Sequence, residues 1–256
     1  MARGYLTKYH FSVFAMKVRI ELYGETVRII GIKQTTSDRC WGAPFTGEES
    51  GAAAIARGYD RMENNICRAR GKVREYGLCN DWDYFATFTL NESKQDRFDL
   101  AQWVKDFGNW IQNYKKKYRC TEFAYLIIPE QHKSGEWHAH GLLRGLAPES
   151  LVRNKYGYLD LPYYARRFGY ISLDPIKDKQ KCASYITKYV SKDARATARA
   201  LRAGQHLYYQ SRGLKGKEIL DEIEGDFDAE WENDFVKIKW MNLNEYQMMK
   251  GTILNG

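Results

Sequence analysis

Hydrophobic and polar residues alternate along residues 9–33, with a turn signal at Tyr23-Gly24-Glu25. A period of two is typical of a half-buried strand, so this segment is predicted to form a β-hairpin. Four later stretches are predicted to be strands, and the first of them is rich in aromatic and β-branched residues, which favour a buried strand. The four stretches are residues 82–90, 123–128, 136–144 and 170–173. Ser134-Gly135 lies between the second and third stretches and predicts that these two strands pair antiparallel.

Hydrophobic residues recur at helical spacing in three other segments. They are residues 52–76, 100–118 and 178–192, the last of which follows Asp174-Pro175, a sequence that helps to start a helix. Gly, Thr and Ser around residues 35–51 predict a loop. The order of strands and helices predicts an α+β fold in which a central antiparallel β-sheet is flanked by helices.

The charge of the chain is unevenly distributed. Nine acids and no Lys or Arg lie between Glu218 and Asp234. Setting these nine aside leaves 40 Lys and Arg against 23 Asp and Glu, a net charge of +17 on the rest of the chain. Such a surface attracts polyanions, of which nucleic acid is the commonest, although basic surfaces also serve solubility.

The five cysteines are scattered and form no Cys-x-x-Cys pair, which argues against a zinc ribbon or finger. An odd number of cysteines without a secretory signal fits a reducing cytosol. No apolar stretch of the sequence is long enough to span a membrane. We therefore expect a soluble cytoplasmic protein without a membrane partner.

Basic residues cover several faces of the helix predicted over residues 52–76, among them Arg57 and Arg61. The sequence leaves two interpretations of these charges open. They form a solvated helix face, or they contact the backbone of DNA.

His138-Ala139-His140 lies in the third of the four predicted strands. Side chains two residues apart in a strand face the same side, so the two imidazoles project together. Glu130 lies near the end of the preceding strand, and folding of the hairpin brings its carboxylate toward them. Two neutral nitrogens and one carboxylate leave positions open for water and a phosphate oxygen, which suits Mg²⁺ or Mn²⁺ acting as a Lewis acid. The alternative is a pair of structural histidines.

Tyr185 and Tyr189 are one helical turn apart in the last predicted helix, so they lie on one side of it. Lys188 and Lys192 fall on the neighbouring part of this side, and an apolar arc elsewhere is expected to pack on the sheet. An ammonium group and a metal-polarised phosphate both help a phenol, with its ordinary pKa of about 10, to attack phosphorus. The same tyrosine spacing in the helix over residues 100–118 continues an apolar stripe and is expected to be core.

Three motifs, in their order along the chain, resemble those of the HUH endonucleases that initiate rolling-circle replication. Phe85–Leu90 resembles the first, His138-Ala139-His140 the second, and Tyr185–Lys192 the third in its two-tyrosine form. More narrowly, Cys79–Phe85 and Ser211–Lys215 are similar to segments of phage and plasmid replication-associated proteins.

The resemblance implies a metal-dependent DNA endonuclease and strand transferase, which nicks one strand at an origin, leaves a 5′-phosphotyrosine and a free 3′-OH, and later rejoins the strand. The catalytic residues it implies are Tyr185, Tyr189, Lys188 and Lys192, and the ligands of Mg²⁺ or Mn²⁺ are His138, His140 and Glu130. The expected DNA contacts are Thr87, Thr89, Arg57, Arg61 and Arg212. Which tyrosine attacks first stays open. Relaxases of conjugation have a third histidine where this chain has Arg144, which argues against that class.

Three parts of the chain are expected on this basis: an N-terminal β-hairpin extension at 1–50, a nicking and ligation domain at 51–215 and an acidic C-terminal segment at 216–256. The partner would be single-stranded or hairpin origin DNA. The protein itself would be encoded by a phage or plasmid and act in the cytoplasm of a bacterial cell. The sequence contains no P-loop motif, so strand opening would need a supercoiled origin or a host helicase, and a host polymerase would extend the 3′-OH. A transposase with the same chemistry and a nucleic-acid-binding module without catalysis are the alternatives.

Overall fold

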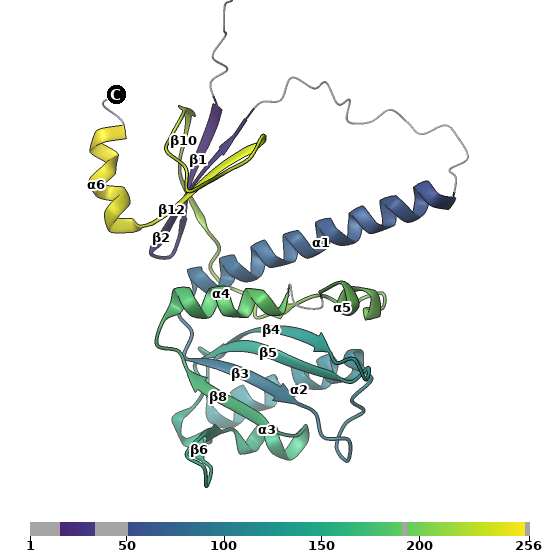
Figure 1. Ribbon diagram of the computed structural model, residues 1–256. Helices are drawn as coiled ribbons and strands as arrows, with labels where there is room; N and C mark the ends of the chain where they lie inside the picture. The colour runs from purple at the N-terminus through teal and green to yellow at the C-terminus, as the bar shows by residue number, and fades with distance from the viewer. Residues whose placement is uncertain (1–15, 34–50, 191–193, 254–256) are drawn as a thin grey trace, which may run out of the picture. The chain divides into compact units, whose positions relative to one another are not determined.

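The computed structural model in Figure 1 describes residues 16–33, 51–190 and 194–253. The chain divides into two compact units. The larger unit is Thr46–Gly216, and the smaller unit combines Met1–Phe45 with Lys217–Gly256. Residues 35–50 of the expected loop and residues 9–15 of the expected hairpin lie outside the described residues.

An antiparallel sheet of seven strands, in the order β6-β7-β8-β3-β5-β4-β9, forms the centre of the larger unit. The strands are β3 (Tyr84–Thr89), β4 (Ala124–Gln131), β5 (Trp137–Arg144), β6 (Val152–Arg153), β7 (Leu159–Asp160), β8 (Ile171–Pro175) and β9 (Tyr209–Gln210). The four strands expected from the sequence correspond to β3, β4, β5 and β8. β4 and β5 pair antiparallel as expected, and Gly135 in the turn between them has a φ of +94°, a conformation that glycine adopts without strain.

Helices cover both faces of this sheet (Figure 1). On one face lie α1 (Gly51–Cys79), α4 (Lys179–Tyr189) and α5 (Ala194–Ala200), and on the other α2 (Leu100–Tyr118) and α3 (Pro162–Arg167). A short 3-10 turn, η1 (Pro148–Ser150), follows β5. This architecture confirms the α+β prediction of a central sheet flanked by helices. No helix in the described part of the chain is both long enough and apolar enough to cross a membrane.

Each face of the sheet buries its own apolar cluster. On the first face, Leu126 of β4 packs in one cluster with Val73 of α1 and Ile186 of α4. On the second, Phe88 of β3 belongs to a larger aromatic cluster that includes the fully buried Tyr114 of α2. The tyrosine spacing in α2 is therefore part of the core, as expected, whereas the fully buried residues of α4 lie on its apolar arc and Tyr189 is only partly buried.

The smaller unit contains a five-stranded antiparallel sheet in the order β10-β1-β2-β12-β11. Its elements are β1 (Met16–Tyr23), β2 (Thr26–Ile32), β10 (Glu218–Gly225), β11 (Trp231–Glu232), β12 (Val236–Asn242) and the helix α6 (Leu243–Ile253). β1 and β2 form the expected hairpin, which turns at Gly24. The acidic stretch supplies β10, which pairs with β1 and places Glu222 opposite Arg19 and Glu224 opposite Lys17. Part of its negative charge therefore faces basic residues of the hairpin.

Candidate functional site

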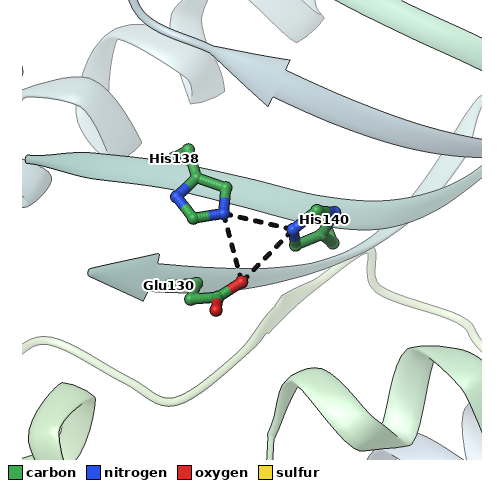
Figure 2. A group of neighbouring side chains, drawn as sticks. All are labelled: Glu130, His138 and His140. Carbon is green, nitrogen blue, oxygen red and sulfur yellow. Dashed lines mark hydrogen bonds and ion pairs between the residues drawn. The ribbon is translucent and has the colours of Figure 1, made fainter. Parts of the chain in front are cut away.

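Glu130, His138 and His140 point toward one another from the paired strands β4 and β5 (Figure 2). Strand register brings them together, because Glu130 lies directly opposite His138 and Ile128 lies opposite His140. Nε2 of His138 is 3.1 Å from Oε2 of Glu130, Nε2 of His140 is 3.2 Å from the same oxygen, and the two Nε2 atoms are 3.2 Å apart. We call these three residues the metal triad, because they form the candidate ligand set expected from the sequence.

The spacing of the three ligand atoms fits a single divalent ion. Neighbouring ligands of an octahedral ion, each about 2.1 Å from it, lie about 3.0 Å apart. Ligands of a tetrahedral ion at the same distance lie about 3.4 Å apart. The observed separations of 3.1 and 3.2 Å fall between these values. Three ligands on one side of an ion leave its other positions open to water or to an oxygen of a substrate.

The surroundings of the metal triad keep its carboxylate charged and one ring oriented. Burial opposes the charged form of Glu130, but hydrogen bonds from His138 and His140 and their charges outweigh burial and hold the pKa of this carboxyl well below its ordinary range. Nδ1 of His140 lies 3.2 Å from Oγ1 of Thr87 on β3. A hydrogen bond there fixes the ring with Nε2 directed toward the triad. Glu130 is therefore ionised at neutral pH and can act as a ligand.

Close packing holds the β5 backbone immediately after the second histidine. A Cβ atom at Gly141 would lie 2.8 Å from the carbonyl oxygen of Leu126 and 3.1 Å from side-chain atoms of Ile127 and Phe88. Only glycine leaves room for this approach, because a carbon atom at 2.8 Å from a carbonyl oxygen is inside van der Waals contact. The glycine that follows His140 therefore lets the strands that carry the metal triad pack closely.

Tyr185 and Tyr189 of α4 lie beside the metal triad. The ring of Tyr189 stacks on the ring of His140, with centroids 3.7 Å apart and planes inclined at 25°. Its hydroxyl donates a hydrogen bond of 2.7 Å to the hydroxyl of Tyr185. The ring of Phe85 on β3 contacts both, with centroids 5.2 Å from Tyr185 and 6.0 Å from Tyr189. The structure thus brings together the two tyrosines and the histidine pair that the sequence singled out.

The apolar side of α4 holds the tyrosines in this position. Ala183 and Ile186 are buried, and a Cβ atom at Gly77 of α1 would lie only 3.1 Å from Cβ of Ala183. At the start of the helix, the side chain of Asp178 accepts a hydrogen bond of 2.9 Å from the backbone N–H of Lys181. The contact with α1 and this N-cap together fix the position of α4 on the sheet.

The two tyrosines have different environments. Tyr185 is 47% exposed, whereas Tyr189 is partly buried. Burial raises the pKa of Tyr189, and the hydrogen bond to Tyr185 and the negative charge of Glu130 raise it further. Nζ of Lys188 lies 5.9 Å from the ring centroid of Tyr185, on the exposed side of the helix. Lys192, the second lysine expected to assist, lies outside the described residues.

The two threonines expected to contact DNA lie in β3, next to the strand with the histidines. Thr87 is opposite His140 in the β3–β5 pairing and is the residue that hydrogen-bonds its ring. Thr89 is opposite His138 and is exposed. Thr87 therefore contacts a residue of the metal triad, a contact that the sequence motif did not predict.

Neither Arg61 nor Arg212, two of the three arginines expected to contact DNA, belongs to the metal triad or to the ring contacts around it. Arg61 is exposed on α1, and Arg57 lies in the same helix with a side chain outside the described residues. Arg212 is exposed after β9 and lines a hollow of about 550 Å³ together with Lys115 and Arg144. The structure therefore gathers neither Arg61 nor Arg212 around the tyrosines.

Two aromatic residues of the site were not expected from the sequence. His132, in the turn between β4 and β5, stacks on His138 with ring centroids 4.0 Å apart. Phe85 stacks on His140 with centroids 5.9 Å apart, in addition to its contacts with the tyrosines. The sequence position of His132, two residues after Glu130 in the same hairpin, could have indicated that it lies beside the metal triad. Phe85 gave none, because an aromatic residue in a strand is more often part of the core.

Residues 83–194 match the model of a protein family described as replication-associated protein ORF2. The match spans 112 of the 256 residues, lies entirely in the larger unit and includes β3, the metal triad and α4. Neither the curated proteins nor the solved structures contain a significant match to the chain. The similarity supports a replication-initiator family for this part of the chain and agrees with the resemblance to replication-associated proteins.

Proposed function

We propose that this protein is a replication initiator that nicks one DNA strand at an origin through attack of a tyrosine on a phosphodiester. The stacking of Tyr189 on His140 supports the proposal most directly, because it brings two phenols next to the metal triad. The similarity of residues 83–194 to replication-associated proteins supports the biological setting. The nick would start rolling-circle replication, with a host helicase and polymerase acting after it.

The proposed reaction exchanges one phosphate ester for another. A phenol oxygen of Tyr185 or Tyr189 forms a bond to phosphorus, and the bond between phosphorus and the 3′ oxygen breaks. The phenol gives up its proton, and the departing 3′ oxygen takes one up. The protein stays on the 5′ end as a phosphotyrosine, and the free 3′-OH is available for extension. In the reverse reaction a 3′-OH attacks the same phosphorus and releases the tyrosine, so rejoining needs no ATP.

Glu130, His138 and His140 are proposed to hold Mg²⁺ or Mn²⁺. An ion bound there supplies Lewis-acid polarisation of a phosphate oxygen. The protein contributes the orientation of its ligands and a positive charge beside the nucleophiles. Because the pKa of Tyr189 is raised, its phenol is protonated at neutral pH and needs a nearby cation to lose its proton. Lys188, on the exposed side of α4, is positioned to stabilise a phenolate or a phosphate.

The distance between the two tyrosine hydroxyls supports alternating roles. The hydroxyl oxygens of Tyr185 and Tyr189 are 2.7 Å apart, so a phosphate within reach of one is close to the other. One tyrosine would then hold the 5′ end of the nicked strand while its neighbour attacks the next copy of the origin. The greater exposure of Tyr185 favours it as the tyrosine that meets incoming DNA.

Two histidines and one carboxylate also bind iron in oxygenases that leave three metal positions open. Three features favour phosphoryl transfer over that chemistry. Two tyrosines with hydrogen-bonded hydroxyls lie beside the metal triad, and one of their rings stacks on His140. The chain is basic outside its acidic segment, and the family match concerns replication.

Formation of a covalent protein–DNA adduct tests the proposal. The full chain is incubated with Mn²⁺ and a pool of single-stranded oligonucleotides with random internal sequence. A denaturing gel separates adducts that survive boiling in detergent, and mass spectrometry identifies the modified residue. We expect an adduct on Tyr185 or Tyr189 that disappears in the Tyr185→Phe, Tyr189→Phe double variant.

The matched control is the Tyr156→Phe, Tyr158→Phe double variant. These tyrosines are 72% and 60% exposed and lie at the β6–β7 edge of the sheet, far from β4 in strand order. We expect this variant to form the adduct at the level of the unmodified chain. The proposal is wrong if the whole pool yields no adduct, or if the adduct persists without the hydroxyls of Tyr185 and Tyr189.

A further inference from the structure

A groove of about 980 Å³ lies in the larger unit between α1 and the segment that follows α5. Its walls include Arg61 and Arg68 from α1, Arg202 and Tyr208 from the segment before β9, and Tyr209 of β9 itself. Its volume is at the upper end of the range of about 300–1,000 Å³ that is usual for ligand clefts. The proposed nicking chemistry uses none of these residues.

The groove has a positively charged wall. Arg61, Arg68 and Arg202 are exposed, and none of them forms an ion pair within the part of the chain that the structure describes. No Asp or Glu lines the groove among the described residues. Lys72 also lines it, but its ammonium group is bound to Glu75 at 2.8 Å. Guanidinium groups without acidic partners favour a ligand that carries several phosphates.

Tyrosine rings lie among these arginines. Tyr208 and Tyr209 both line the groove and are partly exposed. The ring of Tyr208 lies 6.4 Å from that of Tyr76, and the hydroxyl of Tyr209 accepts a hydrogen bond of 3.1 Å from the backbone N–H of His206. These contacts restrain both rings. Restrained aromatic rings beside basic side chains are the usual combination for binding unpaired bases and their phosphates.

The groove lies close to the metal triad along β4. In the pairing of β9 with β4, Tyr209 is opposite Ile127. Tyr208, the residue before Tyr209, packs on the other face of the sheet with Leu126 and Ile128. Glu130 shares that face with Leu126 and Ile128, and it lies about 7 Å beyond Ile128 along the strand. A nucleotide chain of modest length in the groove is therefore within reach of the metal triad.

We propose that this groove binds single-stranded DNA. Its role in holding the nucleotides next to the attacked phosphate rests on the proposed function, whereas the binding itself does not. A single strand fits better than a duplex because its bases are free to stack on Tyr208 and Tyr209, while duplex bases stack on one another. The three arginines would contact its phosphates.

Fluorescence anisotropy of the full chain with a labelled single-stranded oligonucleotide tests this inference. The measurement is made in EDTA, so that it does not depend on nicking, and over a series of salt concentrations. The Arg68→Ala, Arg202→Ala variant removes two phosphate contacts. Each contact to a single strand contributes about 0.7 to the slope of log K against log salt, so the slope should fall in magnitude by about 1.4.

The matched control is the Lys105→Ala, Lys116→Ala variant, which removes the same charge from exposed positions of α2 on the opposite face of the sheet. We expect its slope to equal that of the unmodified chain. The inference is overturned if the salt slope of Arg68→Ala, Arg202→Ala equals that of the control variant. It is also overturned if the variant loses affinity only for duplex DNA, or only for RNA of the same sequence. The adduct assay separates the two proposals. If the slope is reduced but no adduct forms, groove binding is supported and nicking is contradicted. If an adduct forms but the slope is unchanged, nicking is supported and groove binding is contradicted.

Discussion

The imidazole of His140 and the phenol ring of Tyr189 are stacked, with centroids 3.7 Å apart and planes inclined at 25°. This contact joins β5, which carries two residues of the metal triad, to α4, which carries the proposed nucleophiles. Aromatic pairs of this kind contribute about 0.5–1.5 kcal/mol beyond the area they bury. Tyr189 is therefore expected to stabilise a metal ligand as well as to attack phosphorus.

Two substitutions of Tyr189 are expected to separate the contribution of its ring to Mn²⁺ affinity from that of its hydroxyl. Tyr189→Phe keeps the stacked ring, so Mn²⁺ affinity should stay within about twofold, whereas Tyr189→Leu loses the stacking and should weaken binding by about 2- to 10-fold. Calorimetric titration with Mn²⁺ measures both. Tyr185→Leu is the control, because Tyr185 contacts the rings of Phe85 and Tyr189, and these two rings stack on His140. Equal affinities of Tyr189→Leu and the unmodified chain would show that the stack does not support the ligand.

Thr87→Val is expected to weaken Mn²⁺ binding by about 10- to 100-fold, the usual effect of removing a partner that orients a metal-ligating histidine. The substitution keeps the shape of the side chain but removes the hydroxyl 3.2 Å from Nδ1 of His140. Thr89→Val, in the same strand, is the matched control for metal affinity, since its exposed side chain lies opposite His138 without a hydrogen bond to it. If the two variants bind Mn²⁺ equally well, Thr87 does not orient the ligand.

Much of the metal triad could be predicted because each step uses residues close together in sequence. Alternation along a strand puts His138 and His140 on one face. The turn at Ser134-Gly135 then sets the register that places Glu130 opposite His138. Helical periodicity likewise separated the apolar arc of α4 from its tyrosines. The spacing of apolar residues was enough to predict which side of the helix, including Ile186, is buried.

Relationships between residues far apart in the chain could not be predicted in this way. β1 pairs with β10, so that Arg19 meets Glu222 across 203 residues of sequence, and no local pattern indicates this. β6, β7 and β9 contain two residues each, which is too short to show a period. The basic groove depends on β9 and the segment before it. Arg61 was expected to contact DNA, but no sequence pattern connected it with Arg68, Arg202, Tyr208 and Tyr209.

Glu21 of the smaller unit is expected to make stability depend on pH. It is 1% exposed, and its carboxylate accepts hydrogen bonds from Lys217, Arg28 and Tyr23. Burial opposes ionisation, but these hydrogen bonds outweigh it and lower the pKa of Glu21 below its ordinary value of 4.5. Its contribution to stability is therefore present above pH 4.5 and is lost as the pH falls toward the folded-state pKa.

Hydrogen exchange of a peptide covering β1, corrected for intrinsic rates and compared between about pH 7 and about pH 3, measures this dependence. Glu21→Gln should lower the free energy of unfolding of the unit by about 1–3 kcal/mol at neutral pH. It should also reduce the loss of stability between about pH 7 and about pH 3. The cost stays below that of breaking a fully buried pair, because Arg28 and Lys217 are 23% and 28% exposed. Glu222→Gln, which removes the exposed partner of Arg19, should cost less than about 1 kcal/mol. If Glu21→Gln and the unmodified chain lose the same stability at acid pH, the pH dependence comes from other groups.

Gly77→Val is expected to displace α4 and with it the nucleophiles. A Cβ atom at Gly77 would lie 3.1 Å from Cβ and 3.3 Å from Cα of Ala183, so a branched side chain must push the backbone of α4 away. Overpacking of this kind costs about 1–3 kcal/mol, which lowers the Tm of a unit of this size by about 2–12 °C.

Gly71→Val is a matched control in the same helix, because a Cβ atom at Gly71 meets nothing within 4 Å. Both substitutions replace glycine in α1 by the same residue, so any difference between them comes from the contact with α4. We expect Gly77→Val to lose most of its adduct while it still binds Mn²⁺, at most about 10-fold more weakly because the Tyr189 stack is disturbed. Gly71→Val should keep both properties. Retention of the adduct by Gly77→Val would mean that the tyrosines reach the phosphate without the α1–α4 contact. Loss of Mn²⁺ binding as well would place the damage in the sheet, and the position of α4 would then not be what limits attack.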